Sequence, residues 1–142
     1  MNNNKERNKT DRPTDTGGRR LTFREAVTLA EDQIALHEYP RRHILWGVLH
    51  DLCRVMAEIY MMSPTATVRV AGEELEAGLV ADVYREVTPE MAETLAAELQ
   101  GQLAGVTHMK AYLRSALYIK AFEYEACEVR LEEQIRRETG VL

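Results

Sequence analysis

Residues 67–90, TVRVAGEELEAGLVADVYREVTPE, contain the strand signal on which the fold prediction rests. The segment Thr67–Val70 alternates polar and apolar side chains, which is the pattern of a short strand with one buried face. The next residues favour a turn in which Gly72 can adopt a positive φ angle, and Leu75 can then lie back beside the strand. A helix is expected to start near Ala77. This stretch therefore predicts a β-hairpin between helical segments.

The sequence on both sides of the hairpin predicts helices. Thr22 and Glu25 form a capping box, and Thr88-Pro89 places proline directly after a hydroxyl cap. Residues 44–60 repeat apolar side chains at i, i+3, i+4 and i+7 over more than four helical turns. The predicted fold is mainly α, with about five helices and one short β-hairpin between the second and third helices. The expected helices span about residues 23–36, 42–61, 77–86, 89–103 and 108–139.

Charge divides the chain of 142 residues into two parts. Residues 1–20 hold six basic and three acidic residues and a single apolar one, and we expect a disordered, solubilising tail. Residues 21–142 hold 12 basic and 20 acidic residues, and we expect a single helical domain with a long C-terminal helix. Such an acidic body does not attract nucleic acid by bulk charge, although the basic tail can add weak phosphate contacts.

Cysteine usage and hydropathy favour a cytoplasmic protein. Cys53 and Cys127 lie far apart in helical patterns, which fits free thiols in a reducing compartment better than a disulfide. The sequence has no signal-peptide pattern and no apolar run of membrane length, so we expect no membrane contact.

No sequence pattern typical of catalysis or metal binding is found. His37-Glu38 resembles the start of a zinc-protease motif, but Arg41 stands where the second histidine is required. His43 and His50 are seven residues apart, whereas two histidines that bind one metal on a helix are normally four apart. Glycine loops for phosphate, a nucleophile elbow and a CxxC pair are all absent from the sequence. We therefore expect a non-enzymatic protein with no catalytic residues, metal or cofactor.

One group of candidate contact residues is basic and aromatic. Lys110, Arg114 and Tyr118 follow one another at one-turn spacing on a helix, so they share a face that can track a nucleic-acid backbone. Arg69 lies between two valines of the predicted strand and points to the face opposite them. The alternative for all four is a solvated surface with tyrosine packing.

The second group of candidates is the predicted hairpin turn. Gly72, Glu73 and Glu74 are a candidate partner-binding turn, because they project two carboxylates from the tip of the hairpin. The alternative is a solvated tip, since no histidine, lysine or nucleophile lies nearby in sequence for acid–base chemistry.

The run VRVAGEELEAGLVADVYREVTPEMAETLAAEL, followed by HMKAYLRSALY, resembles a known family. It is similar to the C-terminal domain, of unknown function, of RepA-like replication initiator proteins from plasmids and integrative elements of Gram-positive bacteria. The resemblance covers roughly residues 34–121, and His108 and Ile119-Lys120 depart from the family pattern. The matched positions are Thr67, Val68, Arg69, Val70, Ala71, Gly72, Val80, Met109, Lys110, Tyr112, Leu113, Ala116, Leu117 and Tyr118.

This resemblance implies a function in mobile-element replication. The 142 residues show no counterpart of the winged-helix part of those initiators, so we expect the accessory domain alone or a small relative. The predicted function is a non-enzymatic accessory or protein-interaction domain linked to plasmid or phage DNA replication, with a protein of that machinery as partner. The alternatives are a weak DNA-binding module that uses the tail and the last helix, and an acidic inhibitor that mimics nucleic acid. A homo-oligomer is left open.

Overall fold

The computed structural model describes residues 20–139, without the side chains of residues 125–131 and 139. The molecule is mainly helical and has a two-stranded antiparallel hairpin between its second and third α-helices, which confirms the predicted fold class. The predicted tail lies outside the described residues except for residue 20, and so does the side chain of Cys127. The elements in chain order are α1 (Phe23–Gln33), the 3₁₀ turn η2 (Leu36–Glu38), α2 (Trp46–Tyr60), β1 (Thr67–Val70), β2 (Glu73–Glu76), α3 (Ala77–Tyr84), α4 (Pro89–Leu99) and α5 (Met109–Thr139).

The predicted start signals of α1 and α4 are both formed. The Thr22 hydroxyl accepts a hydrogen bond from the Glu25 amide at 3.1 Å, and the Glu25 carboxylate accepts from the Thr22 amide at 2.9 Å. The Thr88 hydroxyl accepts from the Met91 amide at 3.2 Å, and Pro89 is the first residue of α4. These side chains satisfy amides that a helix leaves unpaired at its N-terminus.

The connection between α1 and α2 is longer than the sequence predicts. The α1 helix ends at Gln33 rather than near residue 36, because Ala35 takes a left-handed conformation with φ of 58° before η2. The α2 helix begins at Trp46 rather than near residue 42. The segment before it forms a turn in which the Leu45 amide donates to Nδ1 of His43 at 3.0 Å.

The predicted buried face of the second helix needs one correction, and so does the end of the fourth. Ile44, expected on the apolar stripe, lies in the turn before α2 and is 67% exposed. The α4 helix ends at Leu99 rather than near residue 103, and the chain leaves it through Gly101 in a left-handed conformation. Trp46, the first residue of α2, is partly buried and packs against the core.

The hairpin is fixed by its turn as well as by its strands. Val68 pairs with Leu75 across the two strands. Ala71 and Gly72 both have positive φ angles, of 54° and 83°, as a two-residue turn of primed type requires. Glycine adopts such angles readily, whereas alanine loses roughly 1–2 kcal/mol there. The Ala71 amide donates to the Ser115 hydroxyl at 2.8 Å, which helps to hold this conformation.

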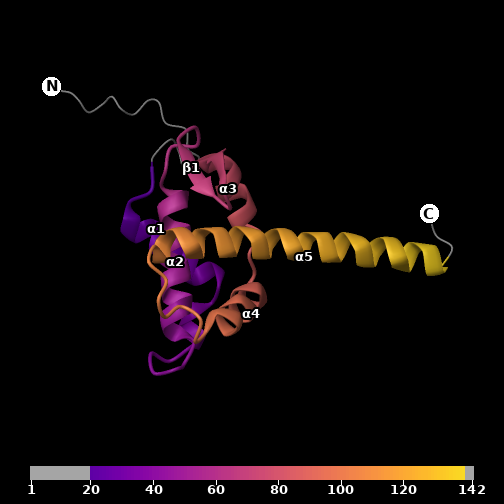
Figure 1. Ribbon diagram of the computed structural model, residues 1–142, viewed down its shortest axis with the longest axis horizontal. Coiled ribbons are helices and arrows are strands. Elements are labelled where there is room, and N and C mark those ends of the chain that lie inside the picture. The colour runs from indigo at the N-terminus through magenta and orange to yellow at the C-terminus, as the bar shows by residue number, and fades with distance from the viewer. Residues whose placement is uncertain (1–19, 140–142) are drawn as a thin grey trace.

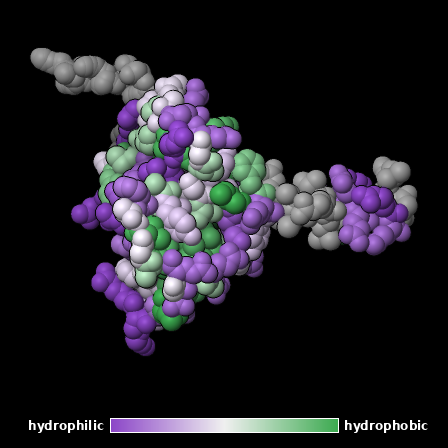
Figure 2. All heavy atoms as spheres, in the orientation of Figure 1, coloured by the Kyte–Doolittle hydropathy of each residue, from purple (hydrophilic) through white to green (hydrophobic). Residues whose placement is uncertain are grey.

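The core gathers around α2, which is buried along most of its length. Leu52 and Met56 are fully buried, and Leu113 and Leu117 of α5 close the core from the other side. Figure 1 shows α5 crossing the body and then extending well beyond it. Figure 2, in the orientation of Figure 1, shows apolar patches among hydrophilic side chains on the face of the body that is in view. Within residues 20–139, no helix combines the length and apolar composition needed to cross a membrane.

Candidate functional site

The hairpin turn lies on α5, beside Tyr118 of the predicted basic and aromatic face. The hydrogen bond from the Ala71 amide to the Ser115 hydroxyl joins the turn to the first half of this helix. We name this region the hairpin–α5 surface. It consists of Gly72, Glu73 and Glu74 in the turn and Tyr112, Tyr118, Ile119 and Phe122 on α5.

The outer face of α5 carries exposed apolar side chains on this surface. Tyr112, Ile119 and Phe122 are each between 41% and 46% exposed, and they share one side of the helix with Ser115. The opposite side of the same helix carries the buried core residue Leu117. Neighbouring exposed apolar groups bordered by polar ones are typical of interaction sites. The sequence resemblance included Tyr112, but sequence reasoning did not identify the outer stripe as a contact surface.

The tyrosine of the predicted basic face belongs to this surface. The ring of Tyr118 packs edge-on against Phe122, with ring centroids 4.9 Å apart. Burial, and after it the negative charge of Glu73, raise the pKa of the Tyr118 hydroxyl.

Arg69 lies on the exposed side of the hairpin. Its guanidinium is 3.4 Å from the carboxylate of Glu74 on the opposite strand, and both side chains are more than 60% exposed. An exposed pair of this kind contributes at most about 1 kcal/mol to stability. Arg69 therefore remains accessible to a partner at a small energetic cost.

Lys110 and Arg114 face α2 and do not form an open basic track. The Lys110 ammonium is 2.7 Å from one carboxylate oxygen of Glu58, and the Arg114 guanidinium is 4.0 Å from the other. The Arg114 side chain is only 19% exposed, and its Nε has no hydrogen-bond partner within the described part of the chain. Two residues that the sequence placed on a basic face thus share one carboxylate, which offsets about half of their positive charge.

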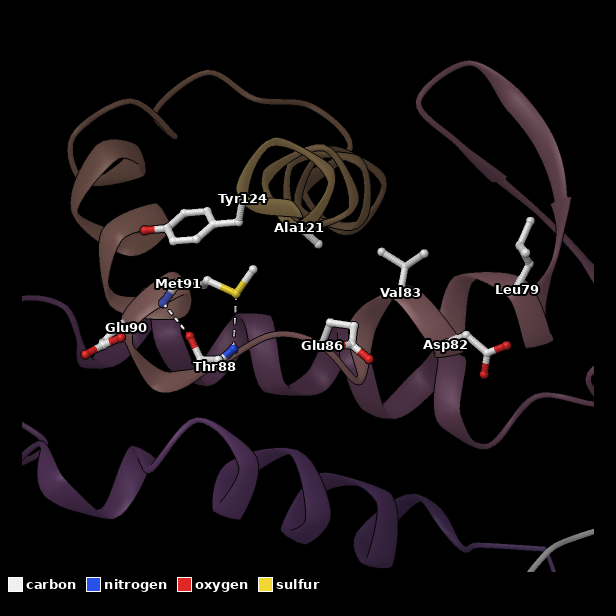
Figure 3. Close-up of a pocket in the computed structure, with 9 residues that line it drawn as sticks. All are labelled: Leu79, Asp82, Val83, Glu86, Thr88, Glu90, Met91, Ala121 and Tyr124. Atoms are coloured by element: carbon white, nitrogen blue, oxygen red, sulfur yellow. Dashed lines mark hydrogen bonds between the residues drawn. The ribbon is translucent and has the colours of Figure 1, made fainter. Parts of the chain in front are cut away.

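A groove opens where α5 leaves the body, between α3 and the start of α4 (Figure 3). Its volume is about 570 Å³. Figure 3 shows Tyr124, Ala121 and Val83 along its apolar part, with Asp82 and Glu86 on the α3 side. This groove could not be predicted from the sequence, because its walls come from three helices separated along the chain.

The far end of α5 lies beyond the other helices of the body (Figure 1). All side chains from Glu132 to Glu138 are exposed, and Figure 1 shows this end extended away from the other helices. Ile135 is 50% exposed and lies 18 residues, or about five helical turns, beyond the buried Leu117. The side of α5 that enters the core therefore continues outside it.

Sequence reasoning missed a second cluster of aromatic and basic residues, at the corner between η2 and α2. We name it the corner cluster. Of its residues, sequence reasoning considered His43 and His50 as metal ligands and did not connect the others. The signal that could have revealed it is the run YPRRHILWGVLH, which has aromatic and basic residues and no acidic one. The cluster consists of Tyr39, Arg41, Arg42, His43, Trp46 and His50.

No group of three or more residues able to hold a metal ion occurs in the described part of the chain. Neither a family model nor a curated protein nor a solved structure matches the sequence or the fold. The assignment of a function therefore depends on the surfaces described above and on the resemblance in residues 34–121.

Proposed function

We propose that this chain is a non-enzymatic protein-interaction domain that binds a protein partner through the hairpin–α5 surface. The observation that carries the proposal is the exposed stripe of Tyr112, Ile119 and Phe122 beside an anchored hairpin turn. Helices of monomeric domains bury one apolar side, and a second exposed one is typical of a contact surface.

The partner that suits this surface presents apolar side chains bordered by basic groups. The carboxylates of Glu73, Glu74 and Glu123 are exposed around the stripe. The neighbouring cation Arg69 already pairs with one of them, Glu74. Opposite charges at the rim of an interface mainly steer association, while the apolar centre supplies most of the affinity. The anchored turn favours binding as well, because little conformational entropy remains to be lost there.

We further propose that the partner belongs to the replication machinery of a plasmid or related mobile element. This step rests on the resemblance of residues 34–121 to the C-terminal domain of RepA-like initiators. DNA binding through Lys110 and Arg114 has less support, because both side chains lie next to Glu58. An acidic inhibitor that mimics nucleic acid is supported only by the net charge.

A two-hybrid assay in bacteria tests the proposal against a defined set of partners. The set consists of the initiator, helicase and primase proteins of Gram-positive plasmids. We expect one of them to bind the full chain and to lose binding when Ile119→Asp places a charge in the stripe. The matched control is Leu29→Asp, which changes a residue of similar exposure, 50%, on α1.

Two results would contradict the proposal. The first is that no protein of the set binds the full chain. The second is that Leu29→Asp weakens binding as much as Ile119→Asp, because the contact would then not involve the hairpin–α5 surface.

A further inference from the structure

The corner cluster combines stacked aromatic rings with unpaired positive charge. The indole ring of Trp46 and the imidazole of His50 are stacked, with centroids 4.7 Å apart and planes 10° from parallel. The guanidinium of Arg41 lies over the same indole at 5.0 Å, and Tyr39 packs edge-on against His43 at 5.0 Å. The cluster thus already holds two flat groups against the face of one aromatic ring.

The arginines of the corner differ from the cations near α5. Lys110 pairs with Glu58, and Lys120 pairs with Glu98 at 2.9 Å. By contrast, Arg41 and Arg42 make no ion pair with any carboxylate of the described residues, and both are exposed. Their charge is therefore available to an anionic ligand.

Two carboxylates lie beside Tyr39, at one edge of the cluster. Burial, followed by the charge of Glu93 and more weakly that of Glu38, raises the pKa of Tyr39. Residues 39–50 themselves contain no carboxylate, although the body as a whole is acidic. Arg41 and Arg42 thus lie in a stretch without negative charge, and Glu38 and Glu93 border it on the Tyr39 side.

We propose that the corner cluster binds single-stranded nucleic acid. In the bound state, Arg41 and Arg42 contact successive phosphates, and a base stacks on the ring of Trp46 in the place now taken by the Arg41 guanidinium. An exposed cation–π contact is worth about 0.5–1 kcal/mol, whereas stacking of a base on an aromatic side chain is worth about 1–3 kcal/mol. The exchange is therefore favourable, and it releases Arg41 for a phosphate.

Single strands suit the cluster better than duplexes or acidic proteins. A duplex keeps its base faces stacked inside and offers only phosphates, so it would leave the indole surface unused. An acidic peptide would likewise engage the arginines without a planar group for Trp46. The site is small and takes only a few nucleotides, so we expect weak binding with a marked dependence on salt.

The chain contains a single tryptophan, and it lies in the site. Its fluorescence therefore reports stacking at the corner and is insensitive to nucleic acid held elsewhere, for example by residues 1–20. We would titrate the full chain with the tetranucleotide (dT)4 at low salt and follow quenching of Trp46. An abasic deoxyribose-phosphate tetramer of the same charge is the control ligand.

We expect (dT)4 to quench the fluorescence to saturation and the abasic tetramer to leave it unchanged. The double variant Arg41→Gln/Arg42→Gln should bind (dT)4 about tenfold more weakly. The slope of log K against log salt should also fall by about 1.4, since each phosphate contact on a single strand contributes about 0.7. Both arginines are exposed, so the variant should keep its melting temperature.

The matched control variant is Lys110→Gln/Arg137→Gln, which removes the same charge from exposed positions outside the corner. It should bind (dT)4 like the unmodified chain. Absence of quenching by (dT)4 would overturn the proposal, and so would equal weakening by the two double variants. Recovery of Trp46 fluorescence on adding tetraglutamate at a concentration below that of the bound (dT)4 would instead assign the corner to an acidic protein.

Discussion

Replacing Gln33 by alanine removes three hydrogen bonds that join distant parts of the fold. The Gln33 amide group donates to the carbonyl oxygens of Tyr84 and Val87 at 2.8 and 2.9 Å. Its carbonyl oxygen accepts from the Tyr60 hydroxyl at 2.7 Å. Gln33 ends α1, Tyr84 ends α3 and Tyr60 ends α2, so one side chain ties three helix ends together.

The size of the effect follows from these contacts. A typical hydrogen bond contributes about 0.5–1.5 kcal/mol, and leaving a buried polar group unpaired costs about 1–3 kcal/mol. The site is only partly buried, so water can replace part of what is lost. We expect Gln33→Ala to lower the free energy of unfolding by about 2–3 kcal/mol. In a domain of this size, that corresponds to a fall in melting temperature of roughly 10 °C.

A double-mutant cycle in urea, followed by circular dichroism, measures the coupling. Tyr60→Phe alone should cost about 1 kcal/mol, and it should cost almost nothing when Gln33 is already alanine. The exposed Gln100→Ala is the control and should change stability by less than about 0.5 kcal/mol. Additive effects of the two substitutions, or a loss below about 0.5 kcal/mol for Gln33→Ala, would refute the reasoning.

Three further predictions concern pH, the hairpin anchor and the core. Burial raises the pKa of Tyr60 and of the Cys53 thiol to about 12, above the ordinary values of 10.0 and 9.0. Stability should therefore be complete below about pH 9 and fall as the pH rises towards 12, and Tyr60→Phe should flatten the fall between pH 10 and 12 in a denaturation series. Ser115→Ala should cost about 1 kcal/mol and speed hydrogen exchange of the Ala71 amide, measured by NMR; unchanged exchange would contradict the anchor. Leu117→Ala should cost about 2–4 kcal/mol in urea unfolding, and a loss below about 1 kcal/mol would contradict its burial.

Features set by neighbours in sequence could be predicted from the chain alone. The capping box at Thr22, the Thr88-Pro89 start and the positive φ angle at Gly72 depend on residues within a few positions of each other. The apolar repeat of residues 44–60 likewise predicted a helix, although Ile44 is exposed because the turn before Trp46 delays its start.

Features set by residues far apart in sequence could not be predicted. Periodicity placed Lys110 and Arg114 on one helix face, but it did not indicate which side of α5 meets the body. The side that meets the body is the one that faces Glu58 of α2, about 50 positions earlier, which lies against both side chains. The same limit applies to Ser115, whose hydroxyl meets a hairpin amide 44 residues away.

The two proposed binding sites lie at opposite ends of α2. The corner cluster surrounds the start of this helix, and the hairpin–α5 surface lies towards its end (Figure 1). A helix of 15 residues spans about 22 Å, which separates a base stacked on Trp46 from the hairpin. Saturating (dT)4 should therefore leave the affinity for a protein partner unchanged within about twofold. Mutual exclusion would mean that the two ligands share a surface, and one of the two assignments would then have to be withdrawn. Independent binding would instead describe a domain that holds a protein and a single strand at the same time.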